Sequence, residues 1–397
     1  MYELLKGIRI VDLTTTYLGP YATQFLGDMG ADIVKVESLT GDIGRAPLPS
    51  RHPEMGAGFI NSNRNKRSLA VDLKTPKGRD VVLRLASTAD AFVHNMRPKA
   101  AQKLGLAYAD LKGLNPNLVY CCAAGFGQDG PYADDPAYDD IIQAMSGLAR
   151  LNQDDEGTPR FLPSIVADKV MGLHLAFALA SGLVHRLKTG EGCAVEAPMF
   201  ESMVAFLLVE HLAGRSFEPP LGPAGYERLL VNNRRPYRTR DGFIAIMPYT
   251  TLQWTRFLEC IGRADLLALD WVKDPVRRSA NVDALYQLIA DAAPAKTTEE
   301  WLALMKEREI PCGRANSLDD LFDEPHLKAV GLFEKVTHPS EGAMHTVRSP
   351  FRVSGAAKRP DRPAPRLGDS SKAILLEAGF SAAEVQQLAD EGVIRTS

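Results

Sequence analysis

A strand–helix–strand unit near the start of the chain constrains the fold more than any other feature. Residues 8–13 and 31–37 are two short runs rich in Ile and Val, and residues 21–30 between them have the composition of a helix that ends at a glycine. Two strands joined by a helix within about 30 residues pair in parallel, through a right-handed crossover. The N-terminal region is therefore predicted to begin a parallel sheet.

Three further apolar runs extend this sheet. A Thr75-Pro76 pair marks the start of a helix after the first of them. The predicted strands comprise residues 68–73, 91–95 and 118–124. The expected fold class is α/β, with an open, doubly wound parallel sheet in a large domain.

The loops of such a sheet indicate where a ligand binds. Ligands lie beyond the carboxyl ends of the strands, and this edge collects the loops at residues 14–20, 37–44, 95–99 and 125–138. The first of these loops contains Leu18-Gly19-Pro20 and lacks a G-x-G-x-x-G sequence. A nicotinamide or flavin dinucleotide is therefore disfavoured as the ligand.

The most apolar stretch, residues 163–192, predicts a long helix. It is hydrophobic nearly all round, so we expect a buried helix that ends at Lys188 and the glycines that follow. The apolar run is under about 18 residues long and is broken by His174, which favours a core helix over a membrane span.

Asp168, at the start of this helix, permits two interpretations. As an N-cap, its carboxylate would accept a hydrogen bond from a main-chain N–H two or three residues on, which contributes about 1 kcal/mol. As a covalent nucleophile, it would be kept ionised by the helix N-terminus, and Gly172 would leave room beside it for a substrate. The two roles are compatible.

Charge and cysteine content exclude several function classes. A net charge of −3 argues against a nucleic-acid or membrane-surface role for the whole molecule. The eight histidines have no H-x-x-x-H spacing, so no metal site is expected. The five cysteines include no C-x-x-C pair and are expected to be reduced thiols of a cytoplasmic protein.

The character of the chain changes near residue 225. A short β segment at residues 242–247 is followed by predicted helices at 253–261, 281–292 and 298–308. We expect a large domain over residues 1–224, a smaller α+β domain over 225–325 and a C-terminal return to the large domain over 326–397.

Six segments, taken together, resemble one family. They are residues 7–13 with Gly19-Pro20, 30–37, 63–68, 125–132, 188–192 and 364–368. In this order they are similar to the family III CoA-transferases, which include formyl-CoA transferase, carnitine CoA-transferase and α-methylacyl-CoA racemase. The resemblance covers essentially the whole chain. It implies a Rossmann-like CoA-binding large domain, a smaller domain, an interlocked homodimer and a nucleophilic aspartate at Asp168.

The resemblance also implies a set of CoA contacts. They fall on Tyr17, Ser38, Val71, Lys74, Asn95, Met96, Arg97, Lys103 and Tyr138. The cations among them suit the phosphates of CoA, and the dense cluster Arg64, Lys66 and Arg67 is a candidate for the same role. The alternatives are solvated surface cations, and ordinary turn and core residues at Asn95 and Met96. Formyl-CoA transferase has glutamine and arginine where this chain has Tyr17 and Ser38, which argues against oxalate or formate as a substrate.

One position favours acyl transfer over racemisation. The racemases use a His-Asp pair in the loop that here reads Pro136-Ala137-Tyr138-Asp139-Asp140. Tyr138 stands at the histidine position, and tyrosine, with a pKa of about 10, is a poor base for a carbon acid. We expect an enzyme that moves CoA between an acyl-CoA thioester and a free carboxylic acid through an aspartyl-CoA thioester. An α-methylacyl-CoA racemase or epimerase is the alternative.

The remaining expectations concern substrates and partners. Arg234 and Arg235 are candidates to grip the far carboxylate of a dicarboxylic group such as succinyl, or to form a structural salt bridge. Main-chain amides of residues 125–130 or of the small domain are candidate oxyanion donors. CoA is expected as a substrate and no cofactor as a permanent group. Neither nucleic acid nor a membrane is an expected partner.

Overall fold

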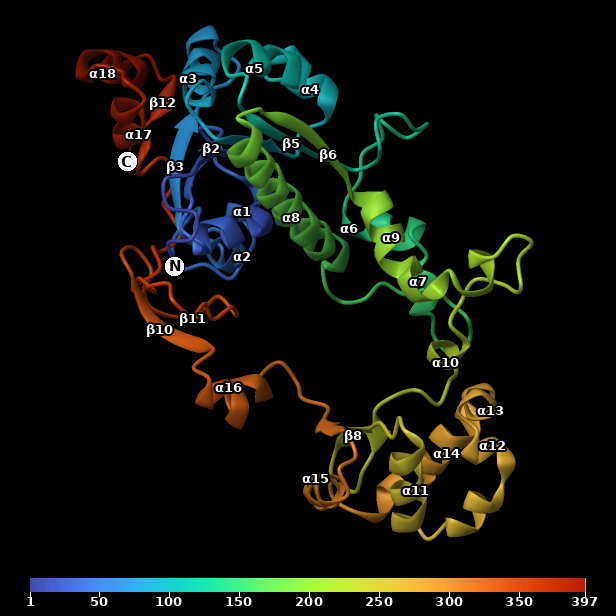
Figure 1. The fold of residues 1–397 in the computed structure, drawn as a ribbon. Coiled ribbons are helices and arrows are strands. Elements are labelled where there is room, and N and C mark those ends of the chain that lie inside the picture. Colours follow the sequence, from blue (N-terminus) through green and yellow to red (C-terminus); the bar gives the residue numbers. More distant parts are fainter. Residues whose placement is uncertain (397) are drawn as a thin grey trace. The chain divides into compact units, whose positions relative to one another are not determined.

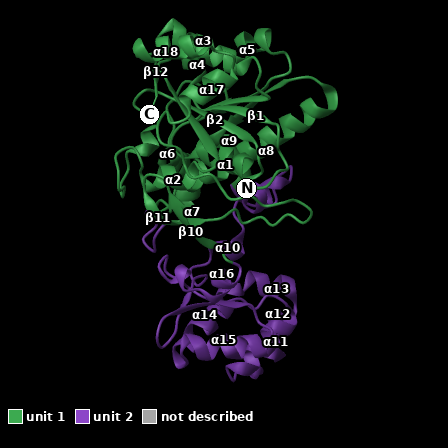
Figure 2. Cartoon of the chain, turned by 90° about the vertical axis from the view of Figure 1, so that its left-hand side faces the viewer, with its two compact units in different colours: residues 1–152, 159–206, 331–397 green, residues 153–158, 207–330 purple. Residues whose placement is uncertain are grey.

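The computed structural model describes residues 1–396, which form two compact units (Figure 2). Unit 1 comprises Met1–Asn152, Pro159–Phe206 and the described residues from Gly331 onward. Unit 2 comprises Gln153–Thr158 and Leu207–Val330. Each unit has its own apolar core.

Unit 1 is built on a sheet whose strands, within residues 1–396, follow the order β12-β3-β2-β1-β4-β5-β6. Every neighbouring pair is parallel except β12 with β3. The strands are β1 (Arg9–Leu13), β2 (Asp32–Glu37), β3 (Lys66–Val71), β4 (Ala91–His94), β5 (Val119–Ala124), β6 (Cys193–Pro198) and β12 (Ile394–Arg395). The predicted α/β class with a parallel-dominated sheet is confirmed. Strands β6 and β12 were not predicted, because one is interrupted by a glutamate and the other has only two residues.

Alternate residues of the central strands face two helical layers. Val11, Val34 and Phe92 pack with α3 (Pro76–Ala86), α5 (Tyr108–Leu114), α17 (Ser371–Glu377) and α18 (Ala382–Asp390). The other layer contains α1 (Leu18–Asp28) and α8 (Val166–Thr189), which lie side by side (Figure 1).

Helix α8 approaches α1 closely at Gly172. A Cβ built on Gly172 would lie 2.9 Å from the carbonyl oxygen of Leu18 and 3.0 Å from the ring of Tyr21. The glycine therefore permits helix packing. The prediction that it leaves room for a substrate is wrong, because α1 already fills that space.

Helix α8 is buried on one face only. Met171, Leu175 and Leu179 are buried, whereas Leu173 is half exposed and Phe177 is 75% exposed. The expectation of a helix buried all round is therefore wrong for the single chain. By length and composition, α8 is the one helix within residues 1–396 that could cross a membrane. Its buried face packs against α1, β5 and β6, as the core helix of a globular unit does.

The layer that contains α1 also buries charge. The Nζ of Lys35 in β2 donates to Oδ2 of Asp42 over 2.8 Å and to the carbonyl of Thr14 over 2.9 Å. Oδ1 of Asp42 accepts from the N–H groups of Thr16 and Gly44. Burial acts to lower the pKa of Lys35, but neighbouring carboxylates, Asp42 foremost, outweigh it and raise the pKa. The ion pair thus joins the loops that follow β1 and β2.

The cationic cluster of Arg64, Lys66 and Arg67 stabilises the fold. Lys66 is fully buried, and the two arginines make close ion pairs with carboxylates. The partners are Asp28 for Arg64, Asp12 and the carbonyl of Pro20 for Lys66, and Asp32 with Glu377 for Arg67. The prediction that this cluster binds CoA phosphates is wrong, because internal partners already occupy all three cations.

Unit 2 combines a small antiparallel sheet with helices. Trp254, Phe257, Tyr286 and Trp301 fill its core. The sheet order is β7-β8-β9, with strands β7 (Tyr237–Arg238), β8 (Phe243–Ile246) and β9 (Cys312–Arg314). The principal helices are α11 (Thr251–Cys260), α14 (Val282–Ala292) and α15 (Thr298–Glu307), each within two residues of its predicted start.

Further helices and strands complete both units. They are α2 (Ala57–Ser62), α4 (Pro98–Lys103), α6 (Asp139–Met145), α7 (Leu148–Leu151), α9 (Met199–His211), α10 (Glu227–Leu230), α12 (Asp270–Lys273), α13 (Pro275–Ala280), α16 (Pro325–Ala329), β10 (Phe333–His338) and β11 (Gly342–Val347). The last two form an antiparallel hairpin in unit 1.

Lys35→Met is expected to lower the free energy of unfolding by about 3–5 kcal/mol, because it leaves the carboxylate of Asp42 buried without its cation. Urea denaturation followed by far-UV circular dichroism measures this change. The matched control is Lys77→Met, which breaks the exposed ion pair with Glu391 and is expected to cost at most about 1 kcal/mol. Equal losses in the two variants would contradict the role given to Lys35.

Candidate active site

A cavity of about 280 Å³ lies at the carboxyl edge of the unit 1 sheet. Thr15 and Thr16 line it from the loop after β1, Asn95 and Arg97 from the loop after β4, and Gly125 from the end of β5. Strands β1 and β4 are neighbours at the point where the strand order reverses, which is where sheets of this kind bind ligands.

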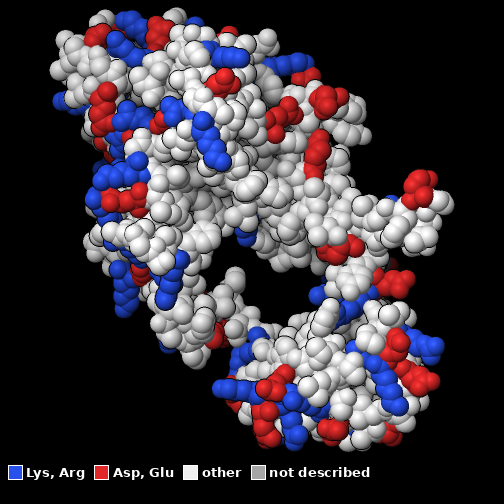
Figure 3. Space-filling model, viewed as in Figure 1, with Lys and Arg blue, Asp and Glu red and all other residues white. Residues whose placement is uncertain are grey.

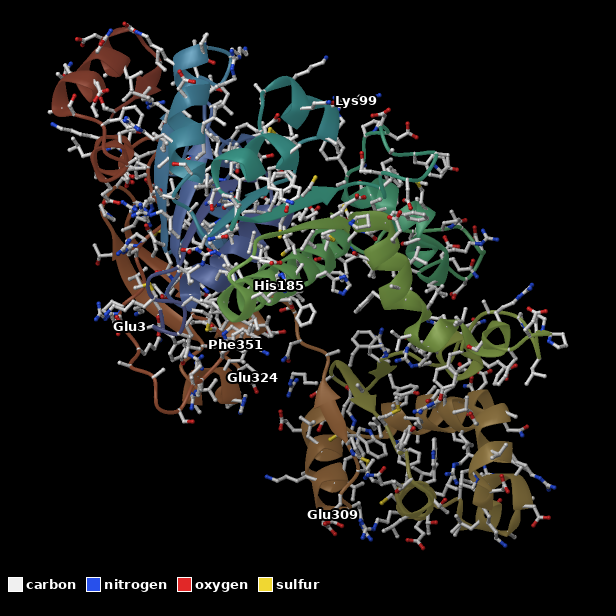
Figure 4. The ribbon with its side chains drawn as sticks, turned by 45° about the horizontal axis from the view of Figure 1, so that its top comes forward. Glu3, Lys99, His185, Glu309, Glu324 and Phe351 are labelled. Carbon is white, nitrogen blue, oxygen red and sulfur yellow. The ribbon has the colours of Figure 1, made fainter. Side chains whose placement is uncertain are left out.

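Hydrogen bonds between loops shape this cavity. The side-chain amide of Asn95 donates to the carbonyl of Thr15 over 3.0 Å and accepts from its N–H over the same distance. Thr16 is held at a φ of 70°, an uncommon conformation for a β-branched residue. Lys99 of α4, labelled in Figure 4, pairs with Asp134 and joins the loops after β4 and β5. The rim is therefore built before any ligand arrives.

Asp168 lines the same cavity from the first turn of α8. The helix begins at Val166, and its N-cap position is Ile165, which makes no side-chain capping bond. The prediction of Asp168 as the N-cap is therefore wrong. Its main-chain N–H donates to Oδ1 of the buried Asp139 over 2.9 Å. Asp139 thus accepts a hydrogen bond from an N–H in the first turn of α8, and Asp168 itself lines the cavity.

The environment of Asp168 opposes its ionisation. Burial, and then the negative charge of Asp139, raise the pKa of Asp168 to about 7. The expectation that Asp168 would be kept ionised is wrong in direction, because burial and the charge of Asp139 both raise its pKa. A carboxyl with this pKa holds or releases its proton near neutral pH, which is the range suited to catalysis.

Asp139 and Gln143 lie beside Asp168, and the sequence did not assign them to the site. Both lie on α6, and Nε2 of Gln143 donates to Oδ2 of Asp139 over 2.6 Å. Gln143 also accepts from the N–H of Leu162 and donates to the carbonyl of Ser164. Asp139 follows Tyr138 in the loop that was compared with the racemases. Its contact with Asp168, however, depends on how α6 packs against α8.

Of the predicted CoA contacts, three share the cavity with Asp168. These are Asn95, Arg97 and Tyr138, of which Arg97 and Tyr138 are exposed at its mouth. The side-chain amide of Asn95 is hydrogen-bonded to the main chain of Thr15, so Asn95 forms part of the cavity wall. The structure brings these residues together from loops that are far apart in the sequence.

The other predicted CoA contacts lie near the carboxyl ends of β1, β2, β3 and β4 or on α4. Lys74 and Lys103 are exposed, and the hydroxyl of Ser38 donates to the carbonyl of Gly41. Val71 is fully buried in the core, so a contact there would use the main chain. The remaining two are Tyr17, whose hydroxyl lies beside Gly58, and Met96, which packs against the core. Arg234 and Arg235 belong to unit 2, where both are exposed.

The predicted oxyanion donors of the 125–130 loop are partly occupied. The N–H of Gly127 donates to Oε1 of Glu201 over 2.8 Å, and the N–H of Gln128 donates to Oε1 of Glu196 over 2.7 Å. These two amides therefore do not serve as free donors. Among the glycines of this loop, Gly125 lines the cavity.

The described part of the chain holds no group of three or more His, Cys, Asp or Glu side chains placed to bind a metal ion. Its cysteines at positions 121, 122, 193, 260 and 312 are free thiols. The polar groups at the cavity are two carboxyls, on Asp135 and Asp168, with an amide, a guanidinium and hydroxyls. Such a set permits nucleophilic attack by a carboxylate, and its guanidinium can bind an anion.

Comparison with known proteins identifies the family of this chain. The family model of CoA-transferase family III matches residues 5–371. This chain belongs to CoA-transferase family III. It is an enzyme with CoA-transferase activity, which moves CoA between an acyl-CoA thioester and a carboxylic acid.

Relatives of this CoA-transferase match it over nearly their whole length. It is 32% identical to the succinate–glutarate CoA-transferase of Agrobacterium fabrum, over 94% of this chain and 95% of that protein. It is 31% identical to the succinyl-CoA:glutarate CoA-transferase of Mus musculus, over 98% and 90%. The crystal structure of Rv3272 from M. tuberculosis superposes with a TM-score of 0.82 at 29% identity, over 94% of this chain and 99% of that one.

Asp168→Asn is expected to raise the melting temperature at pH 8 by a few °C, on the order of 2–5 °C, and by less at pH 5. The raised pKa of Asp168 means that its ionisation is opposed in the folded state, so the wild type loses stability as pH rises from about 4 to about 7. The asparagine variant has no such loss. Thermal unfolding at both pH values measures the difference, and a larger gain at pH 5 than at pH 8 would contradict it.

Proposed function

We propose that Asp168 is the nucleophile of this CoA-transferase. The observation that carries the proposal is its position: a carboxyl at the ligand edge of the sheet, lining a cavity with Asn95, Arg97 and Tyr138. Its main-chain N–H is already satisfied by Asp139, so the side chain is not needed to cap the helix. Carboxylates are established covalent nucleophiles in enzymes.

The first half-reaction transfers CoA from the donor to the enzyme. An oxygen of the Asp168 carboxylate attacks the thioester carbon of the donor acyl-CoA, and CoA leaves as its thiolate, which forms a mixed anhydride. The thiolate then attacks the aspartyl carbonyl of the anhydride. The donor acid leaves as its carboxylate, and an aspartyl-CoA thioester remains on Asp168.

The second half-reaction is the reverse with another acid. The acceptor carboxylate attacks the aspartyl thioester and releases the thiolate, which then attacks the acceptor acyl carbon of the new anhydride. The products are the acceptor acyl-CoA and the free carboxylate of Asp168. Each step passes through a tetrahedral oxyanion, which requires N–H donors close to the reacting carbon.

Exposed cations supply the charge that the phosphates of CoA need. Arg97, Lys74 and Lys103 make no ion pair with a carboxylate in residues 1–396, so their charges are available to a ligand. Charge-assisted hydrogen bonds from guanidinium and ammonium groups are the usual means of binding pyrophosphate. We infer that the predicted contact set, from Tyr17 to Tyr138, includes the CoA site.

Dicarboxylic acyl groups such as succinyl are the substrates we favour. The names of the relatives in Agrobacterium fabrum and Mus musculus specify succinyl or succinate and glutarate. Arg234 and Arg235 are exposed and make no ion pair with a carboxylate in the described residues. Either guanidinium would suit the second carboxylate of such a substrate.

A homodimer accounts for the apolar surface of α8. Phe177 is 75% exposed and Leu187 67% exposed, and Leu173 and Val184 are each about half exposed. The surface over the middle of α8 carries few charged side chains (Figure 3). Apolar surface of this extent is typical of a protein–protein interface. The interlocked form of the dimer rests on the family resemblance.

Intact-protein mass spectrometry after incubation with succinyl-CoA tests the nucleophile. The wild type is expected to gain the mass of CoA less one water and to lose it when glutarate is added. Asp168→Ala is expected to gain nothing, because the attacking carboxylate is absent, and Asp140→Ala, an exposed acid nearby, should behave as the wild type. An adduct on Asp168→Ala would overturn the assignment.

The same experiment separates the racemase alternative. If several acyl-CoA donors gave no adduct on the wild type, and a 2-methylacyl-CoA took up deuterium from heavy water, the protein would be a racemase. A proton-abstracting pair, and not covalent transfer, would then be at work.

Asp139→Asn is expected to move the acidic limb of the pH profile of kcat/KM to lower pH, by roughly 0.5–1 unit. The substitution removes the negative charge that helps to raise the pKa of Asp168, and its amide oxygen can still accept the Asp168 N–H. Asp140→Asn is the matched control and should leave the limb in place. A limb that stays fixed or moves upward in Asp139→Asn would contradict this account.

A further inference from the structure

Unit 2 contains a cavity of its own, with a volume of about 580 Å³. Its walls come from α10, the segment before α11, α13 and α14. The volume falls within the range of small-molecule sites. None of the residues that line it belongs to the active-site cavity or to the CoA contacts implied by the family resemblance.

Two arginines line this cavity. Arg228 places its guanidinium 4.6 Å from the ring centroid of Tyr249, and its Nε donates to the hydroxyl of Tyr286 over 3.1 Å. Arg278 is only 6% exposed, and its Nη1 donates to the carbonyl of Val272 and the hydroxyl of Thr251. A guanidinium has five N–H donors, so each arginine retains donors beyond these bonds.

Neither arginine makes a close ion pair, although the charge of Asp274, at the start of α13, acts on Arg278. Within residues 1–396, no carboxylate forms an ion pair with Arg228 or Arg278. A buried guanidinium with no counter-ion in contact is costly to maintain, and an anionic ligand would lower that cost. Of the lining residues, Glu227 alone carries negative charge, so the two arginines leave the cavity with a net charge of +1.

Aromatic rings form much of the remaining wall. Tyr226, Tyr249, Trp254 and Tyr286 all line the cavity. Flat aromatic faces bind flat apolar groups by stacking, and the guanidinium of Arg228 is already stacked in this way. The lining therefore combines flat apolar surface with a fork of N–H donors.

We propose that this cavity binds an aromatic or similarly flat monocarboxylate. The planar guanidinium groups match a carboxylate in geometry, and the net charge of +1 matches a single negative charge. A nucleoside monophosphate shares the flat body but carries a phosphate with nearly two charges, so it is the competing ligand. The proposal does not depend on Asp168 or on CoA transfer.

Intrinsic fluorescence of the full-length protein gives a direct test. The three tryptophans of the chain, Trp254, Trp271 and Trp301, all belong to unit 2, and Trp254 lines the cavity. Titration with benzoate, excited at the red edge of tryptophan absorption, is expected to give a saturable change. Acetate, which has the carboxylate without the ring, should give a much weaker one. The variant Asp168→Ala should respond as the wild type does, so this site is separable from the proposed nucleophile.

Variants locate the binding. Arg228→Gln is expected to weaken benzoate binding at least tenfold, because it removes both charge and fork, and Arg228→Lys should weaken it less. Arg277→Gln is the control, since Arg277 is exposed on α13, the helix that also carries Arg278, and does not line the cavity. Absence of a saturable change up to about 10 mM benzoate, or equal binding by Arg228→Gln, would overturn the proposal. Tighter binding of AMP than of benzoate would overturn the choice of a monocarboxylate.

Discussion

Lys35 carries its ammonium group into the interior of unit 1, where it meets Asp42 and the carbonyl of Thr14. Through this contact the loop after β1 and the loop after β2 are tied to each other, and Asp42 extends the tie to the N–H of Thr16. The cavity that contains Asp168 begins at Thr15 and Thr16, so its wall depends on a charge pair beneath it. An apolar pair of similar volume could be equally stable, but it could not bind these main-chain groups. The Lys35–Asp42 pair therefore contributes more to the positioning of these two loops than to net stability.

Asp139 has two opposing effects on Asp168. Its carboxylate accepts the main-chain N–H of Asp168, which orders the first turn of α8, while its charge disfavours ionisation of the Asp168 side chain. Gln143 holds Asp139 in place and also binds the segment that leads into α8. An acid kept near neutral pKa in this way is less stable in its ionised form than a surface carboxylate. Such local instability is common where a side chain must react.

The parts of the fold that the sequence predicted well are those with a strong local pattern. Strands β1, β2 and β4 are short apolar runs, and the starts of α3 and α15 carry Pro or a Thr-x-x-Glu capping box. The predictions from sequence failed where the same residue type suits either a ligand site or the packed interior. The composition of an anion site is found at Arg64, Lys66 and Arg67. Their carboxylate partners, however, include residues distant in the sequence, such as Glu377. Gly172 has the size to admit a ligand, yet α1 occupies the space.

The sequence by itself determined the parallel α/β class, the edge of the sheet where the cavity lies and the acid in the first turn of the longest helix. Periodicity, turn residues and strand–helix–strand spacing are local properties. Only the tertiary structure decided which acid neighbours Asp168, in which direction its pKa moves and which cations remain free. These properties arise from distances between residues such as Asp139 and Asp168, or Arg67 and Glu377, and from the exclusion of water around them. Spacing along the chain does not encode such distances, because they depend on how separate elements pack.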